Sequence, residues 1–159
     1  MKIRSSALGF TLMELILVIV LLSILSLFAV SRFMGSSSFS AYTLQERVIS
    51  VIRQVQVNRM QSNVASPDNN FRLQVSSSCV GSVAACELTD SAQDARSDVV
   101  IDKSAKFSVI SGAANTINFN LLGNPVSGAV NILIEDKHGR SRCQVEINSQ
   151  GYVSKGTCS

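Results

Sequence analysis

The sequence is poor in charged and aromatic residues. Only 16% of its 159 residues are charged, 6% are aromatic, and the formal net charge is +3. So small a positive charge excludes a nucleic-acid binder that relies on a dense basic surface. The sequence also has no charge blocks or low-complexity tracts, which excludes a largely disordered chain. The length permits one modest globular domain.

Histidine is scarce as well, since His138 is the single one in the chain. No serine nucleophile, carboxylate pair or phosphate-binding loop stands in a recognisable motif. We therefore expect neither an enzyme nor a bound cofactor.

What the sequence does contain is one long apolar run. Of the 21 residues from Phe10 to Val30, only Thr11, Glu14, Ser23 and Ser26 are polar. A helix of about 20 mainly apolar residues can cross a bilayer core of roughly 30 Å. We therefore expect residues 10–30 to form a membrane-spanning helix.

Positive residues before this run indicate its orientation. Lys2 and Arg4 would hold the amino terminus in the cytoplasm, so the protein would span a membrane once with its carboxyl-terminal part on the outer side. A secretory signal peptide cut near residues 29–31 is an alternative, but the run exceeds the usual apolar length of roughly 7–15 residues. It also contains Glu14, and a carboxylate at the bilayer centre costs about 2.5–3.5 kcal/mol. An uncleaved anchor is a further alternative.

Residues 9–14 (GFTLME), followed by the apolar residues 15–22, resemble the amino-terminal signature of type IV pilins and type II secretion pseudopilins. The resemblance implies that a prepilin peptidase cuts between Gly9 and Phe10, removes the leader 1–9 and N-methylates Phe10. In a filament, the new amine could pair with Glu14 of a neighbouring subunit. A buried ion pair of this kind can fix register. We therefore expect Glu14 to set the stagger of the subunits.

Beyond the apolar run, a second helical pattern follows. Apolar residues recur at a helical spacing, at Leu44, Val48, Val51, Ile52 and Val55. The charged residues fall outside this apolar series, and we expect them on other faces: Glu46, Arg47, Arg53 and Arg59. Asn63 and the Ser66–Pro67 pair indicate the end of the helix. We expect residues 31–62 to be an amphipathic continuation of the membrane helix.

Residues 63–159 have mainly β patterns. Apolar and polar residues alternate at 71–75, 117–121 and 143–147, and residues 99–101 and 130–134 are also typical of strands. Turns that contain Gly123, Gly139 and Gly151 separate several of these segments. The sequence therefore predicts an α+β fold, with one long helix packed on an antiparallel sheet head.

The head also resembles that of minor pilins and H-type pseudopilins at residues 117–123 and 145–153. With residues 47–49 and 52–56 added, the chain is most similar to minor pilins of the mannose-sensitive haemagglutinin pilus, in particular their C-type component. The resemblance implies a structural subunit that initiates or modulates the assembly of an adhesive pilus. The alternatives are a minor pseudopilin of a type II secretion system and a DNA-binding minor pilin.

This resemblance also implies the partners of the protein. They are other pilin subunits in the filament, the prepilin peptidase, the assembly platform of the inner membrane, and the membrane itself before assembly. A further alternative function is an adhesion module that stays anchored in the membrane, with its head in the periplasm, and never polymerises.

Four cysteines lie on the expected outer side, where disulfides form. They allow three pairings, and we expect the local one, Cys79–Cys86 and Cys143–Cys158, over the crossed ones. In the chain-entropy model, the Cys143–Cys158 bond, which closes the longer loop, would contribute roughly 3 kcal/mol to the free energy of unfolding. Zinc binding is the alternative, but the spacings do not match the usual ligand motifs. We expect no metal site at the cysteines.

Two charged segments of the head have both a plain and a functional interpretation. Asp90, Asp94, Asp98 and Asp102 recur every four residues and could bind calcium, but we expect a solvated acidic edge with at most a short helix. Near the histidine, a basic tip could contact DNA phosphates or another anion through Lys137, Arg140 and Arg142. Its plain interpretation is an exposed turn, because no aromatic residues are interspersed.

Overall fold

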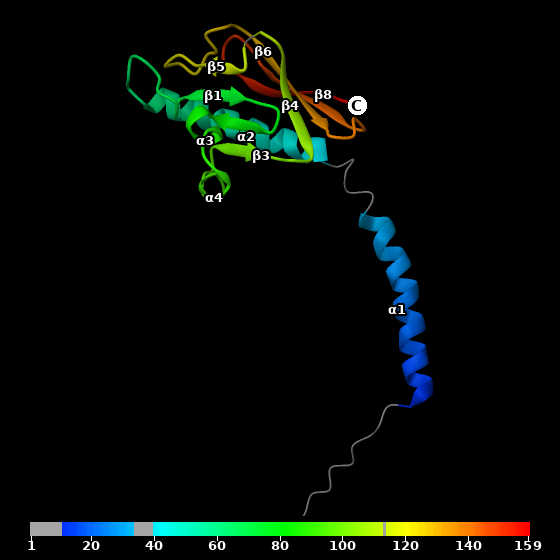
Figure 1. Ribbon diagram of the computed structural model, residues 1–159. Coiled ribbons are helices and arrows are strands. Elements are labelled where there is room, and N and C mark those ends of the chain that lie inside the picture. The colour runs from blue at the N-terminus through cyan, green and yellow to red at the C-terminus, as the bar shows by residue number, and fades with distance from the viewer. Residues whose placement is uncertain (1–10, 34–39, 113) are drawn as a thin grey trace, which may run out of the picture. The chain divides into compact units, whose positions relative to one another are not determined.

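The computed structural model describes residues 11–33, 40–112 and 114–159 (Figure 1). The chain divides into two compact units, Met1–Ser36 and Ser37–Ser159. In the first unit, the described residues form one helix, α1 (Leu12–Phe33). The second contains a long helix, α2 (Ser40–Gln61), and the strands of the head.

Helix α1 begins with a polar cap. The Thr11 hydroxyl accepts a hydrogen bond from the backbone N–H of Glu14 (3.3 Å), which occupies an otherwise unpaired donor of the first turn. Further along, the hydroxyls of Ser23 and Ser26 donate to the carbonyls of Ile19 and Leu22, each at 2.7 Å. The serines thus satisfy their polar groups within the helix. Among the described residues, we find no helix that combines the length and apolar content needed to cross a membrane.

Helix α2 confirms the predicted amphipathic pattern. The expected apolar residues are all buried: Leu44, Val48, Val51, Ile52 and Val55. The helix ends at Gln61, and Asn63 has a φ of 47°, the left-handed conformation common after a helix. Whether α1 and α2 form one continuous helix remains a prediction, because residues 34–39 between them lie outside the described residues.

The expected position of Arg59 on an outer face of the helix is wrong. Its side chain is only 3% exposed. The guanidinium lies at the end of α2 and donates to the Ser62 hydroxyl and to the carbonyls of Val64 and Ala65. It also bonds the carbonyl of Phe119. Hydrogen bonds to these neutral acceptors, some of them in the loop that follows the helix, offset the cost of burying the charged group.

The head contains two four-stranded antiparallel sheets, where the sequence indicated one. The first sheet has the order β3 (Val99–Ile101), β2 (Cys79–Ser82), β1 (Arg72–Val75), β5 (Thr116–Asn118). The second has the order β4 (Ala105–Ser111), β6 (Val130–Asp136), β7 (Arg142–Ile147), β8 (Val153–Cys158). Two four-residue helices lie between β2 and β3 in the chain, α3 (Val83–Cys86) and α4 (Asp90–Gln93).

The strands follow the alternation of the sequence where one of their faces is solvated. In β6, Val130, Ile132 and Ile134 are buried and the residues between them are partly exposed. The expected strand at 117–121 is shorter, because β5 ends at Asn118 and Phe119 forms a single bridge to Pro125. Three turn glycines have positive φ angles as expected, at Gly123, Gly139 and Gly151.

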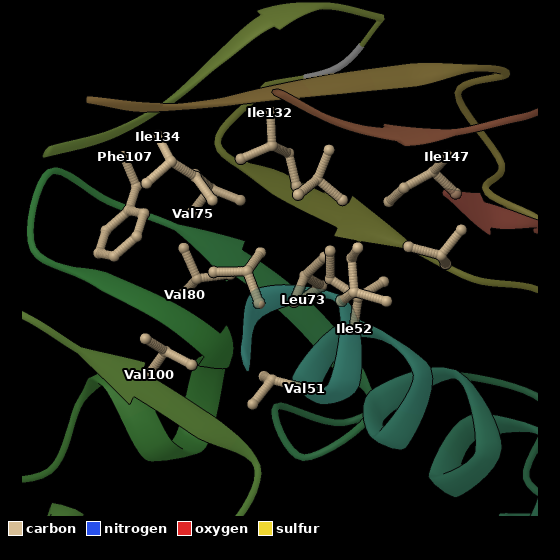
Figure 2. Packing of buried hydrophobic residues seen from close by; sticks show 14 of the residues in the cluster. Val51, Ile52, Leu73, Val75, Val80, Val100, Phe107, Ile132, Ile134 and Ile147 are labelled. Carbon is tan, nitrogen blue, oxygen red and sulfur yellow. The ribbon is translucent and has the colours of Figure 1, made fainter. Parts of the chain in front are cut away.

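A single apolar core lies between α2 and the two sheets (Figure 2). The helix contributes residues such as Ile52, the first sheet residues such as Leu73, and the second residues such as Phe107, Ile132 and Ile147. All five are at most 2% exposed. The head therefore has a hydrophobic core of its own, and the α+β fold class is confirmed.

Candidate functional site

The surface of α1 is apolar on all sides. Every large apolar side chain from Leu12 to Leu25 is exposed, from 43% at Val18 to 77% at Leu12. A helix that is apolar all round is normally surrounded by other apolar groups. An exposed apolar surface of this size indicates an interaction site.

Glu14 is the one charged residue among the described side chains of α1. It lies in the first turn, where a carboxylate interacts favourably with the helix dipole. No cation in the described part of the chain lies within ion-pair distance of it. The expected cleavage and methylation site, Gly9 and Phe10, lies outside the described residues.

The expected basic tip comprises the turn between β6 and β7 and the first residue of β7. Lys137, His138, Arg140 and Arg142 are all exposed there. Both arginines of the tip face carboxylates. The Arg142 Nε lies 3.0 Å from Glu135 Oε1, and the Arg140 Nε lies 3.8 Å from Asp136 Oδ2. The positive charge available to an external anion is therefore smaller than the sequence suggests.

The turn itself has an ordered backbone. Gly139 has a φ of 67°, and its N–H donates to the Asp136 carbonyl at 2.7 Å. The N–H of Lys137 donates to the carbonyl of Ser104, which precedes β4. The turn is thus attached to a second loop of the same sheet.

The expectation of a solvated acidic edge is wrong for Asp98, which is only 5% exposed. Arg96 binds it with two hydrogen bonds, Nε to Oδ1 at 2.8 Å and Nη2 to Oδ2 at 2.7 Å. Burial raises the pKa of Asp98, but the hydrogen bonds from Arg96 and Ser82 and the charge of Arg96 outweigh it, so the net pKa is lowered. Asp98 is therefore a structural anion.

The rest of the acidic segment is divided between different elements. Asp90 begins the short helix α4, and β3 begins at Val99, directly after the buried aspartate. No group of three or more potential metal ligands occurs among the described residues. The regular spacing in the sequence therefore does not correspond to one continuous helix.

Both disulfides have the local pairing. Cys79 at the start of β2 is joined to Cys86 at the end of α3, and Cys143 of β7 is joined to Cys158 of β8. The Cα atoms of the second pair are 4.1 Å apart, because these two residues are register partners in the sheet. This bond attaches the carboxyl-terminal strand to the sheet.

Sequence reasoning missed a set of buried polar side chains on α2. Gln56 donates to the carbonyls of Gly123 (2.9 Å) and Gly151 (2.8 Å), and Gln45 donates to the carbonyl of Gln144 (2.6 Å). Each glutamine joins the helix to turns or strands that are distant in sequence. The sequence could have indicated the burial of both glutamines through their position in the helix, since both lie on the same side as the apolar stripe.

No protein-family model matches the sequence, and no curated protein matches it either. Among solved structures, the protein is similar to the type IV minor pilin FimU of Pseudomonas aeruginosa. The two chains are 10% identical, the TM-score is 0.47, and the match covers 73% of this chain and 92% of that chain.

Proposed function

We propose that the protein is a minor type IV pilin. In this proposal a prepilin peptidase cuts after Gly9 and methylates Phe10, and residues 10–30 anchor the subunit in the inner membrane. The assembly platform then moves the subunit into a filament on the cell surface, where it initiates or modulates the growth of an adhesive pilus. The mannose-sensitive haemagglutinin pilus is the particular filament that we propose.

The observation that supports this proposal most strongly is the surface of α1. The helix exposes apolar side chains all round, so it requires an apolar environment. The proposed anchor is longer than its described part, because it includes Phe10 and residues 27–30, whose side chains are not described. A membrane before assembly and a bundle of equivalent helices after it are two apolar environments that one such surface fits.

Glu14 supplies the second argument. A carboxylate in apolar surroundings is stable only with a partner, and the described part of the chain provides none. Cleavage after Gly9 would create a cationic amine four residues before Glu14, roughly 6 Å along a helix axis. The amine of one subunit and the carboxylate of the next could then pair and fix the stagger between subunits.

The first test replaces the carboxylate by its neutral isostere, Glu14→Gln, in cells that lack the native copy. The amount of subunit in sheared filaments is compared with the amount in the membrane. Leaving one member of a buried pair without its partner costs about 3–5 kcal/mol, so we expect filament incorporation to fall at least about tenfold. The matched control is Glu46→Gln, which removes an exposed carboxylate of α2 that pairs with Lys155. Incorporation of both variants at the normal level would contradict the proposal.

A second test identifies the mature amino terminus. Mass spectrometry of the purified subunit is expected to find N-methylated Phe10. A mature chain that begins at Met1, or near residue 31 as after signal peptidase, would refute the proposed processing.

A minor pseudopilin of a type II secretion system would use the same helix and the same carboxylate. Co-purification distinguishes the two, since the subunit would be found with either pilus or secretion components. A DNA-binding pilin is less well supported, because Arg140 and Arg142 face Asp136 and Glu135. A gel shift with the Arg140→Gln/Arg142→Gln variant tests that function directly.

A further inference from the structure

A hollow of about 470 Å³ lies in the head at the carboxyl-terminal end of α2. Its size is typical of small-molecule sites. The lining comes from the end of α2, the loop that follows it, β1, the end of β5 and the segment after it, and includes Arg59, Pro67, Arg72, Asn118, Asn120 and Val126. Two of these residues are arginines and none is acidic. Asp68, which follows Pro67 in the chain, does not line the hollow.

Arg59 forms the buried side of this hollow. Its Nε donates to the Phe119 carbonyl at 3.0 Å, and its Nη1 donates to the Val64 carbonyl at 2.8 Å. All its acceptors are neutral carbonyl or hydroxyl oxygens, and no carboxylate pairs with it in the described part of the chain. The charge of this buried guanidinium is therefore not neutralised there, which makes the hollow attractive to an anion.

Arg72 supplies the contacting group. It is opposite Asn118 in the β1–β5 register, and its Nε donates to the Asn118 Oδ1 at 2.9 Å. This bond orients the guanidinium of the partly exposed Arg72 and leaves both terminal nitrogens without a partner among the described residues. A planar guanidinium fork of this kind matches a carboxylate in a bidentate geometry.

The two asparagines add further donors. The Asn120 Oδ1 accepts hydrogen bonds from the N–H groups of Leu122 (2.9 Å) and Asn124 (3.0 Å), and the Asn118 Oδ1 accepts from Arg72. Their side-chain oxygens are therefore occupied, and the amide NH₂ groups remain as donors. Pro67 and Val126 provide apolar surface at the same hollow.

We propose that this hollow binds a small carboxylate ligand, with Arg72 gripping the carboxylate and Arg59 providing the positive field behind it. The two asparagine amides donate to polar groups on the body of the ligand. A sugar acid and a peptide with a free carboxyl terminus both carry this chemistry. Ligand binding at this hollow does not require filament assembly, so a negative binding result would leave the proposed function unaffected.

The test titrates the full-length ¹⁵N-labelled protein, purified in a mild detergent, while NMR follows the Arg72 Nε–H and Asn118 side-chain signals. The probes are sodium glucuronate and N-acetyl-glycyl-alanine, and each is compared with a neutral counterpart, glucose and the peptide amide. We expect saturable shifts with at least one carboxylate probe and none with its neutral counterpart. The probe that binds identifies the source of the carboxylate.

The variants test the role of Arg72. We expect Arg72→Gln to weaken binding at least about tenfold, and Arg72→Lys to weaken it too, because lysine keeps the charge but lacks the planar fork. Arg72→Lys also serves as the test if Arg72→Gln does not give a folded spectrum. The matched control is Arg47→Gln, which removes an exposed arginine of α2 roughly 18 Å along the helix from Arg59 and should bind normally. Failure of both carboxylate probes, equal binding of the neutral compounds, or undiminished binding by both Arg72 variants would overturn the proposal.

Discussion

The close contact between two turns of the head makes a quantitative prediction for Gly151→Ala. Gly151 has a φ of 82°, and a Cβ atom added there would lie 2.4 Å from the carbonyl oxygen of Gly123. The two turns are held together by Gln56, whose amide donates to both carbonyls from a buried position. A methyl group at this point therefore cannot fit unless the turns separate.

The expected loss has two parts. A residue with a side chain in the left-handed conformation costs roughly 1–2 kcal/mol. Separation of the turns would break at least one buried hydrogen bond of Gln56, which costs about 1–3 kcal/mol. Together they predict that Gly151→Ala lowers the free energy of unfolding by about 2–5 kcal/mol.

Gly128→Ala is the matched control, because Gly128 has nearly the same φ, 85°, and no atom within 4 Å of an added Cβ. We expect it to lose the conformational part alone, roughly 1–2 kcal/mol. Urea unfolding of both variants, followed by circular dichroism, measures the difference between them. Equal losses in the two variants would refute the reasoning, since the contact between the turns would then contribute nothing.

Three further predictions concern the stability of the head. Removal of the Cys143–Cys158 bond by a double alanine substitution is expected to cost roughly 3 kcal/mol in the chain-entropy model, and an unchanged urea midpoint would contradict it. Asp98→Asn is expected to destabilise the head at pH 7. Because the folded pKa of Asp98 is lowered, its contribution to stability is present above the unfolded pKa of about 4 and is lost as the pH falls through the folded pKa. The difference in unfolding free energy between the variant and the wild type is therefore expected to shrink in acid. A difference that stays constant from pH 7 to pH 2.5 would show that the ionised Asp98 carboxylate is not what stabilises the head. Phe107→Ala removes a side chain that is 2% exposed and is expected to cost about 3–5 kcal/mol, whereas a loss below 1 kcal/mol would mean that its place in the core is wrong.

The sequence predicted individual helices and strands, and their buried faces, where one periodic pattern dominates. The apolar stripe of α2 has a 3.6-residue period, and each of its expected members is buried. The strands at β1, β6 and β7 alternate because one face packs on the core and the other does not. Periodicity is informative here because burial on one side is what produces it.

The missed strands have physical reasons as well. All four residues of β2 are buried, so it shows no alternation, and it contains Gly81, whose missing side chain allows the backbone of Asp98 and Val99 to approach. In β8 the pattern is weak because most of its residues are at least partly exposed. A division into two sheets depends on pairing between distant segments, which no local pattern contains.

The candidate sites divide in the same way. The cost of placing Glu14 in an apolar segment can be predicted from the sequence, because it depends on the apolar residues on either side; the role of Glu14 in assembly stays a prediction. The burial of Arg59 and Asp98 could not, because it depends on partners that only the fold brings near, such as the carbonyl of Phe119 and the hydroxyl of Ser82. A charged residue is expected to be exposed to solvent unless the fold supplies hydrogen-bond partners for it.

The two units of the chain therefore differ in what stabilises them. The head has a core of its own, two disulfides and polar side chains that join α2 to its turns, so its stability is a property of one subunit. Helix α1 has none of these, and its apolar side chains remain exposed along the described length. Its stability must come from its surroundings, and the one carboxylate in it favours surroundings that offer a cation at a fixed position. A neutral residue at position 14 would suit a plain anchor better, so Glu14 supports the proposed role of this helix in assembly.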